Sequence, residues 1–527
     1  MRAILAPYDK SGLVEFAQGL VELGWELYAT GRTELKLGDA GVPVTAVAEL
    51  TGSPELLGGR VKTLHPLVHG GILYRRGHAE DEAEVLAYGI KGIDMVVGGL
   101  YPFVETVMGG PVTLGEALEE IDIGGPTMIR AAAKNHPWVV PLVDPDDYAG
   151  VLEALRGGGP PDGGDGGLDA GRRRELAAKA FAHVAHYDAA IAEYLRGEDD
   201  LLPEQLTVGM TRVAELRYGE NPHQRGAFYT LDSVRAPVEG IGAFEQHHGK
   251  ALSYVNLLDA DAAYNLVAES AQPALAIIKH TNPCCFAAGE EPVAKLYERA
   301  LAAGDAVSAY GGIVATNRPI DLAMATALRE VLSPVSGGRM FFEIVVAPGF
   351  EADGLEHLEK KSRDLRILTV APGDPRRPRL ELRSTRGGVL VQESDLSEEY
   401  AFEVVSDRAP SEAELADLRV AWLLGKHVKS NAITLVHGGV LVGMGAGQPN
   451  RVESARLAVA GAGEAARGAA LASDAFFPFP DSLEVAAAAG VTAAVHPGGS
   501  IRDEESVETA NRLRMALLTA GARHFRH

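Results

Sequence analysis

The chain has 527 residues, enough for roughly two to four domains at about 150 residues each, and its 46% hydrophobic and 23% charged content is typical of a globular protein. Its 49 Lys and Arg against 72 Asp and Glu give a formal net charge of −23, which argues against a nucleic-acid-binding protein that needs a basic face. No apolar run approaches the roughly 20 residues of a membrane span, and the N-terminus does not have the pattern of a signal peptide.

Short apolar runs alternate with amphipathic segments in the first part of the chain. This alternation predicts a parallel sheet covered by helices on both faces. The expected strands are Ala3–Ala6, Glu26–Ala29, Asp94–Gly98 and Trp138–Val143, and the expected helices are Leu13–Leu23 and Gly115–Glu120.

A change of composition then divides the chain. Arg156–Gly171 is rich in glycine and proline and predicts a flexible loop, whereas Arg172–Arg196 has apolar residues at helical spacing. We place the domain boundary in the acidic stretch Gly197–Pro203, which gives domains of residues 1–200 and 201–527.

The alternation resumes after the boundary. The expected strands are Ala274–Ile278, Ile313–Ala315, Ile344–Ala347, Ile433–Val436, Val440–Met444 and Thr492–Val495. Two units end in similar motifs, Lys279-His280-Thr281-Asn282 and Lys429-Ser430-Asn431, which favours two related subdomains. Their expected division lies in the Pro- and Arg-rich stretch Ala371–Arg379, giving residues 201–372 and 373–527.

Two loops after the first expected strands carry groups that bind anions. Lys10 and Ser11 follow the first strand, and Thr30-Gly31-Arg32-Thr33 follows the second. Ligands of open α/β sheets bind at the carboxyl ends of strands, and helix N-termini there supply unpaired N–H donors. Either loop alone is equally consistent with an ordinary turn.

A third polar group lies between two pairs of glycines, on backbone that we expect to be irregular. Arg60, Lys62 and Thr63 in this segment favour a phosphorylated or oxyanionic ligand. His65 and His69 have a spacing seen in metal sites, but we expect the intervening proline to prevent the helix that would align their rings. We therefore expect no metal here.

One acidic residue stands out further along. Asp122 lies among apolar residues and glycines, where its carboxylate is desolvated unless a cation meets it. Lys134 is the candidate partner, which would form an acid–base pair beside Tyr101. A purely structural ion pair is the alternative.

Several motifs together resemble those of a known family. They are Gly58–Gly71, Leu100–Phe103, Asp122–His136, Ala177–Ala190, Leu216–Gln224, Ile278–Pro283, Phe342–Pro348, Lys429–Arg456 and Ser473–Pro480. In this order they resemble the bifunctional AICAR transformylase/IMP cyclohydrolase family, and the resemblance covers essentially the entire chain. It implies an α/β fold, with a methylglyoxal-synthase-like parallel-sheet domain followed by two cytidine-deaminase-like α/β subdomains.

The resemblance also implies two reactions of purine biosynthesis. A formyl group passes from the co-substrate 10-formyltetrahydrofolate to the 5-amino group of AICAR, and formyl-AICAR then closes to IMP with loss of water. Both nucleophiles are weak nitrogens, so each site must remove a proton and stabilise an oxyanion. The deaminase-like fold raises a zinc hydrolase as an alternative, but Pro283-Cys284-Cys285 lacks the spaced second thiol, and we expect no catalytic metal.

Site residues follow from the positions that match the family. For ring closure the resemblance implies catalytic Lys62, Tyr101, Asp122 and Lys134, and phosphate-holding Lys10, Ser11, Gly31, Thr33, Arg60 and Thr63. For formyl transfer it implies His280 as proton acceptor, Lys279 as its assistant and Asn431 as a donor to the formyl oxygen. The remaining substrate and folate positions are Arg217, Tyr218, Asn256, Tyr310, Gly311, Glu343, Arg451, Asp474 and Arg523.

The chain departs from the family pattern at a few positions. Ala6-Pro7-Tyr8, Arg32 and Gly99 replace commoner residues, which predicts an altered phosphate pocket, and Cys285 replaces a common glycine and predicts a narrower pocket beside His280.

The resemblance also has implications for assembly and location. It implies a homodimer whose transformylase sites draw residues from both subunits. Separately, the two cysteines of the chain are adjacent in sequence, which rules out a disulfide framework and favours the cytoplasm. Two alternatives remain open, namely an enzyme that retains one activity and a non-catalytic nucleotide-binding regulator.

Overall fold

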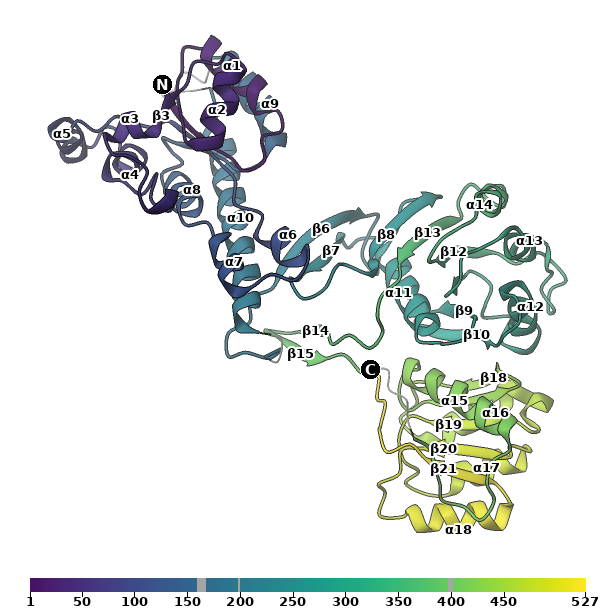
Figure 1. Ribbon diagram of the computed structural model, residues 1–527. Coiled ribbons are helices and arrows are strands. Elements are labelled where there is room, and N and C mark those ends of the chain that lie inside the picture. Colours follow the sequence, from purple (N-terminus) through teal and green to yellow (C-terminus); the bar gives the residue numbers. More distant parts are fainter. Residues whose placement is uncertain (159–166, 198–199, 397–400) are drawn as a thin grey trace. The chain divides into compact units, whose positions relative to one another are not determined.

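The computed structural model describes residues 1–158, 167–197, 200–396 and 401–527 (Figure 1). These residues form two compact units. Unit 1 contains Met1–Met210 and Leu231–Pro237, and unit 2 contains Thr211–Thr230 and Val238–His527. The middle of the loop expected at Arg156–Gly171 lies outside the described residues.

Unit 1 is built on a five-stranded, fully parallel sheet in the order β3-β2-β1-β4-β5. Its strands are β1 Arg2–Ala6, β2 Glu26–Ala29, β3 Thr45–Ala46, β4 Met95–Gly98 and β5 Val140–Leu142. Its α-helices are α1 Leu13–Glu22, α2 Gly31–Asp39, α3 Val47–Thr51, α4 Pro66–Leu73, α5 Ala79–Ala87, α6 Phe103–Met108, α7 Leu114–Glu119, α8 Gly124–Lys134, α9 Tyr148–Arg156 and α10 Ala170–Arg196.

Both faces of this sheet are buried, as the alternating pattern predicts. Along β1, Ala3 and Leu5 belong to one hydrophobic core, while Ile4 between them belongs to another. Successive side chains of a strand point to opposite faces, so these two cores are the two helix-covered sides of the sheet. The predicted parallel sheet is confirmed.

The backbone around the paired histidines differs from the prediction. Pro66 begins α4 instead of preventing a helix, because proline's fixed φ suits the first helical position and its missing N–H is not needed there. His65 is the N-cap of this helix, and its Nδ1 accepts the Leu67 N–H at 3.2 Å. No cluster of side chains suited to a metal is present among the residues that the structure describes.

Unit 2 contains a twelve-stranded sheet in the order β16-β21-β20-β19-β17-β18-β10-β9-β11-β12-β13-β8. Its first half holds β8 Gly240–His248, α11 Tyr254–Ala268, β9 Ala274–Lys279, β10 Asn282–Ala288, α12 Val293–Ala303, β11 Gly312–Thr316, α13 Leu322–Glu330, β12 Phe342–Ala347, α14 Ala352–Glu359 and β13 Arg366–Ala371. Its second half holds β16 Glu403–Val404, α15 Glu412–His427, β17 Ile433–His437, β18 Val440–Gly445, α16 Arg451–Ala462, β19 Ala470–Ser473, α17 Asp481–Ala488, β20 Ala493–His496, α18 Asp503–Leu513 and β21 Ala516–Thr519.

The remaining strands form two separate two-stranded sheets. They are β6 Gly209–Leu216 with β7 Gly226–Asp232, and β14 Leu380–Thr385 with β15 Gly388–Glu393.

The two halves of unit 2 repeat one topology. In each, a helix is followed by an antiparallel strand pair and then by alternating helices and strands, so that β10-β9-β11-β12-β13 corresponds to β18-β17-β19-β20-β21. The halves join where Ala287 of β10 pairs with Val440 of β18. This repetition is what two related subdomains would produce.

The motif correspondence expected from the sequence is nevertheless wrong. Lys279–Asn282 spans the turn between β9 and β10, whereas Lys429–Asn431 comes before β17. The topological counterpart of the first motif is His437–Val440, which spans the turn between β17 and β18. The two similar sequence motifs therefore occupy different topological positions in the two halves.

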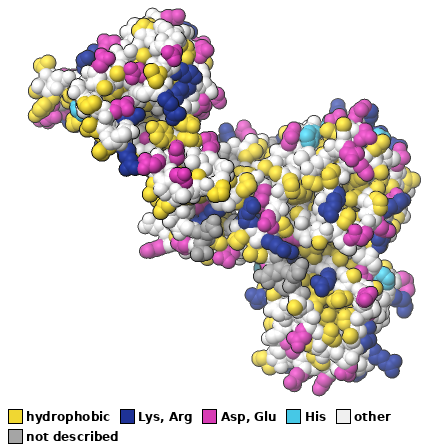
Figure 2. Space-filling view, viewed as in Figure 1, with side chains coloured by type: hydrophobic (Ala, Val, Ile, Leu, Met, Phe, Trp, Pro, Cys, Tyr) yellow, Lys and Arg dark blue, Asp and Glu magenta, His cyan; other side chains and the backbone are white. Residues whose placement is uncertain are grey.

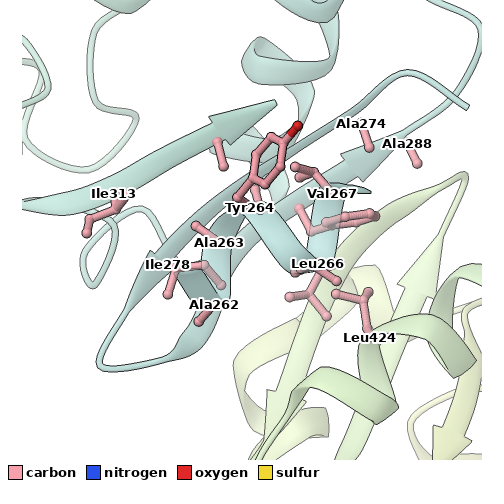
Figure 3. Close-up of a cluster of buried hydrophobic side chains, with 14 of the residues drawn as sticks. Ala262, Ala263, Tyr264, Leu266, Val267, Ala274, Ile278, Ala288, Ile313 and Leu424 are labelled. Carbon is pink, nitrogen blue, oxygen red and sulfur yellow. The ribbon is translucent and has the colours of Figure 1, made fainter. Parts of the chain in front are cut away.

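Helix α11 is central to the core of unit 2. Figure 3 shows its residues Ala263, Leu266 and Val267 in one hydrophobic cluster with Ile278 of β9 and Leu424 of α15. Burial on this scale fixes the helix against the sheet, and thereby fixes the polar groups that α11 presents at the end of β9.

The outer surface agrees with the composition. In Figure 2, acidic and basic side chains are dispersed over the visible faces of both units. Among the described residues, no helix combines the length and apolarity that crossing a bilayer requires.

Candidate active sites

A cavity of about 720 Å³ lies at the carboxyl ends of β1, β2 and β4 in unit 1. This is the edge where open α/β sheets bind ligands. The predicted residues that line it are Lys10, Gly31, Thr33, Arg60, Lys62, Thr63, Tyr101 and Asp122. Segments far apart in sequence thus form one cavity rich in cations and hydroxyls.

Two cations of this cavity are paired with carboxylates. Lys62 Nζ lies 3.1 Å from Glu55 Oε2, and Arg60 pairs with Glu119. Burial, and then the nearby cation of Arg32, lowers the pKa of Lys10. An anionic ligand would relieve this repulsion, which makes the cavity suited to a phosphate.

Asp122 is fixed at the amino end of α8. Its carboxylate accepts the Gly125 N–H at 3.0 Å, and its own N–H donates to the Tyr187 hydroxyl at 2.9 Å. Burial raises the pKa of Asp122, and the N–H groups of Gly125 and Gly124 offset this only in part. A carboxylate with a raised pKa is a better proton acceptor, as a general base requires.

The structure does not bring Lys134 to Asp122. Lys134 is the last residue of α8, about 15 Å from its first turn at 1.5 Å per residue. It lines a different cavity of unit 1, of about 610 Å³, with Arg130, His136 and Arg174. The expected acid–base pair is therefore not formed.

Ser11 also points elsewhere. Its hydroxyl donates to Asp9 Oδ1 at 2.7 Å, closing a local turn, and it is not among the residues that line the 720 Å³ cavity.

Two of the departures from the family pattern fit each other. A Cβ atom at Gly99 would lie only 2.9 Å from the backbone nitrogen of Tyr8, so the loop after β1 can approach only because residue 99 has no side chain. The Tyr8 ring in turn packs edge-on against the Tyr101 ring, with centroids 6.2 Å apart. The altered loop thus brings an aromatic ring to the cavity.

In unit 2, Lys279 and His280 lie at the turn between β9 and β10. His280 and the following Thr281 have φ of 54° and 60°, in the left-handed region. Both of their N–H groups donate to the carboxylate of Asp259, at 3.1 and 2.7 Å. Lys279 Nζ donates to the Tyr310 carbonyl at 2.9 Å, so the predicted site residues Lys279 and Tyr310 are in contact.

Other predicted residues of the first half lie around α11 and β11. The Arg217 guanidinium lies 5.0 Å from the Tyr218 ring centroid, and the Tyr218 carbonyl accepts the Tyr254 N–H at the start of α11. Asn256 belongs to the capping box of the same helix. Gly311 adjoins Tyr310, and its N–H donates to the Phe341 carbonyl at 2.8 Å.

Glu343 is engaged by a residue that sequence reasoning missed. Its Oε2 lies 2.8 Å from Nη1 of Arg366, which is buried. The carboxylate is therefore held by a neighbouring strand of the same half.

A second cluster surrounds Asn431. The Asn431 Oδ1 accepts from Arg451 Nη2 at 2.5 Å, and its Nδ2 donates to the Gln448 carbonyl at 2.8 Å. Arg451 also forms a buried ion pair with Asp474. Arg451 and Asp474 thus orient the amide of Asn431 instead of facing solvent.

Arg523 lies in the same half, near the C-terminus. Its guanidinium stacks 4.3 Å from the Phe525 ring centroid, and the adjacent His524 N–H donates to the Asp474 carbonyl at 3.0 Å.

The two clusters occupy the same edge of the sheet. His280 follows the end of β9 and Asn431 precedes the start of β17, and the antiparallel pairing of β10 with β18 places those ends on one side. Three strand spacings separate β9 from β17, about 14 Å at roughly 4.8 Å each. Within one chain, His280 and Asn431 do not share a contact.

The expectation for Cys285 is wrong. Its side chain is fully buried in a hydrophobic core with residues of α12, so it does not narrow a pocket beside His280. Burial raises the pKa of Cys284 to about 12 and that of Cys285 well above its ordinary value. Neither thiol is suited to act as a thiolate.

Two family profiles match consecutive parts of the chain. The AICARFT/IMPCHase bienzyme family profile matches residues 132–461, and the MGS-like domain profile matches residues 12–127. The chain is 47% identical over 531 residues to the bifunctional purine biosynthesis protein PurH of Bacillus mycoides (strain KBAB4), covering 100% of this chain and 99% of the relative. The chain belongs to the AICARFT/IMPCHase bienzyme family.

Other relatives agree with this membership. PurH of Bacillus subtilis (strain 168) is 46% identical over 532 residues, with 100% of this chain and 99% of the relative covered. The crystal structure of ForH is 43% identical and covers 37% of this chain and 97% of its own, at a TM-score of 0.34 that is too low to bear on the fold. The bienzyme therefore combines AICAR formyltransferase and IMP cyclohydrolase activities of purine biosynthesis, as the sequence resemblance predicts.

Sequence reasoning missed several residues of the bienzyme's candidate sites. Glu55 lies in a segment without periodicity, so nothing indicated that it would meet Lys62. Asp259 did carry a signal, because an aspartate within the apolar sequence of α11 must find partners if it is buried.

Proposed function

We propose that the two activities use separate sites, with ring closure in the first domain, residues 1–200, and formyl transfer in the second, residues 201–527. The supporting observation is that most of the predicted ring-closure residues line one cavity of unit 1, while Lys279, His280 and Asn431 lie on the sheet of unit 2. The subdomains of the second site are residues 201–372 and 373–527.

In ring closure, Asp122 takes the proton of the carboxamide nitrogen as that nitrogen attacks the formyl carbon. The former formyl oxygen is then protonated and leaves as water, while the formamido nitrogen loses its hydrogen. The partly buried carboxylate of Asp122 has the raised pKa that such a base needs. Lys62 stabilises the developing oxyanion, with the backbone at Tyr101 as a second donor. Lys10, Arg60 and the loop at Gly31 hold the nucleotide phosphate.

In formyl transfer, His280 takes the proton of the AICAR 5-amino group as it attacks the formyl group of 10-formyltetrahydrofolate. The bond between the formyl carbon and N10 then breaks, and His280 returns the proton to N10 of the departing tetrahydrofolate. Lys279 assists, and the Nδ2 group of Asn431 donates to the formyl oxygen. Arg451 holds the Oδ1 of Asn431 and the Gln448 carbonyl accepts one Nδ2 N–H, so the amide is oriented and its second N–H is the one that donates to the formyl oxygen. The three groups that act in formyl transfer are all side chains of the protein.

The distance between the clusters supports a shared site. About 14 Å separates β9 from β17 in one chain, so the His280 and Asn431 side chains make no direct contact there. A homodimer in which His280 and Asn431 come from different copies would bring them together at one site. We place the enzyme in the cytoplasm, where its two free cysteines would stay reduced.

The test of this function supplies purified protein with AICAR and 10-formyltetrahydrofolate, and separately with formyl-AICAR alone, and measures IMP. We expect IMP in both reactions. IMP from formyl-AICAR but not from AICAR would mean that only ring closure is retained. Binding of AICAR or IMP without turnover would instead identify a regulator.

A further inference from the structure

We infer that Asp259 is a positioning residue for formyl transfer, which holds the turn between β9 and β10 in the conformation that presents the His280 imidazole. The inference rests on the proposed role of His280 as proton acceptor. Asp259 itself is 6% exposed on α11, and its carboxylate accepts the backbone N–H groups of the turn residues His280 and Thr281.

The turn has a conformation that its own residues do not favour. A tight hairpin with two consecutive left-handed residues is the turn for which Asn-Gly or Gly-Gly is preferred, because a Cβ atom crowds the backbone there. His280 and Thr281 both occupy that region, with φ of 54° and 60°. Something outside the turn must therefore stabilise it.

Asp259 supplies that stabilisation. Each carboxylate oxygen accepts one N–H, from His280 at 3.1 Å and from Thr281 at 2.7 Å. Hydrogen bonds to an ionised acceptor are stronger than neutral ones, and α11 is fixed by the core around it. The carboxylate thus anchors both strained residues to a rigid helix.

The other half of unit 2 contains the same device without the catalytic side chain. Asp417 of α15 accepts the Gly438 and Gly439 N–H groups at 2.8 and 2.7 Å. The two glycines have φ of 58° and 76°, which they adopt without steric cost. The repeat therefore provides an internal comparison in which only the first turn carries side chains that need the anchor.

The remaining backbone group of His280 is also held. Its carbonyl accepts from Thr281 Oγ1 at 2.7 Å and from Asn282 Nδ2 at 3.0 Å. With both peptide groups fixed, the direction in which the imidazole leaves the chain is set by the turn. A relaxed turn with negative φ would direct the ring elsewhere, and small misplacements of a reacting group are costly.

The experiment compares Asp259→Asn with Asp417→Asn in the full-length enzyme. His280 and Thr281 donate to different oxygens of the carboxylate, and in asparagine one of these oxygens becomes an NH2 group, which cannot accept the N–H that faces it. We expect Asp259→Asn to lower kcat for formyl transfer on the order of 10- to 100-fold, with KM for AICAR changed less than about twofold and ring closure unchanged. Asp417→Asn, which loses the same kind of bonds, should change formyl transfer less than about twofold.

A rescue variant separates positioning from general stability. Adding Thr281→Gly to Asp259→Asn removes one strained side chain, and we expect it to restore at least about threefold of the lost kcat. If Asp259→Asn does not fold, Asp259→Glu and Asp417→Glu are compared in the same way.

Three results would contradict the inference. Wild-type kcat in Asp259→Asn, equal losses in the two aspartate variants, or no rescue would each overturn it. His280→Ala tests the underlying function independently. If His280→Ala abolishes formyl transfer while Asp259→Asn is fully active, the inference alone fails, and if His280→Ala stays active, the proposed role of His280 fails.

Discussion

At the scale of single residues, Asp122 combines partial burial with a fixed position at the start of α8. Its replacement by asparagine keeps the shape but removes the proton acceptor. We expect Asp122→Asn to slow ring closure of formyl-AICAR by about 10²- to 10⁴-fold, the usual contribution of a general base. Formyl transfer, measured by loss of 10-formyltetrahydrofolate with AICAR, should be unchanged. A variant that still closes the ring at the wild-type rate would exclude Asp122 as the base.

The same carboxyl group predicts a pH-dependent stability. Burial raises its folded-state pKa above the unfolded value, so the ionised form destabilises the protein at neutral pH, and this cost disappears as the pH falls through that pKa. We expect Asp122→Asn to unfold at a higher temperature than the wild type at pH 7, with a difference that shrinks toward pH 4. Thermal unfolding across this range measures it, and a difference that widens in acid contradicts the assignment.

Gly99 predicts a steric effect. A Cβ atom at this position would lie 2.9 Å from the backbone nitrogen of Tyr8. The backbone cannot move aside as easily as a flexible side chain could. We expect Gly99→Asn to destabilise the protein by about 1–3 kcal/mol and to slow ring closure. Gly38→Asn is the matched control, because nothing lies within 4 Å of a Cβ there. Equal unfolding temperatures for the two variants would show that the loop after β1 does not depend on residue 99.

At the scale of elements, a buried ionic cluster joins the ends of α11 and α15. Glu269 at the end of α11 lies 2.9 Å from Lys426 Nζ and 3.1 Å from His427 Nε2, and all three side chains are at most 8% exposed. Burial alone would raise the pKa of Glu269, but the contacts with His427 and Lys426 outweigh it and lower the pKa to about 2. This ionic cluster thus links the two halves of unit 2.

We expect Glu269→Gln to destabilise the protein by about 3–5 kcal/mol in denaturant unfolding, because Lys426 would be left buried without its partner. Since the folded-state pKa is depressed, the wild-type contribution is present above the unfolded value of about 4.5 and is lost as the pH falls toward about 2. Glu298→Gln, from an exposed pair with Lys295, should cost at most about 1 kcal/mol. Similar losses in both variants would contradict the role of burial.

The elements also show how far sequence reasoning reached. Period and apolarity identified β1, β2, β4, β5, β9, β11, β12, β17, β18 and β20, because buried strands are short apolar runs. They missed other strands of the unit 2 sheet, among them β8, β13, β19 and β21, and also β10, whose first residues Asn282 and Pro283 look like a loop. They also misjudged Pro66, since proline begins a helix as readily as it interrupts one.

The sites were predictable to a similar degree. Motif resemblance identified residues that the structure gathers in one cavity, because the carboxyl ends of parallel strands meet at one edge. It could not separate Lys134 from Asp122, because only the helix between them sets their distance. Nor did it point to Asp259: an aspartate in the apolar sequence of α11 indicates a buried partner, but not that the partner is the turn 21 residues further along.

At the scale of the whole molecule, the shared site predicts complementation between two impaired variants. His280→Ala and Asn431→Ala should each lose formyl transfer. If a site combines His280 of one copy with Asn431 of the other, a mixed dimer has one intact site, and random mixing of subunits restores about a quarter of wild-type activity. Co-expression of the two tagged variants, followed by assay of the purified mixture, measures this. No activity above the separate variants would place both residues in a site within one chain.

The measurement that tests the two-site scheme most directly is a crossed assay of His280→Ala and Asp122→Asn. Each purified, folded variant is given AICAR with 10-formyltetrahydrofolate and, separately, formyl-AICAR. The scheme predicts that His280→Ala forms IMP only from formyl-AICAR, whereas Asp122→Asn consumes AICAR and accumulates formyl-AICAR. Loss of both reactions in either folded variant would contradict separate sites.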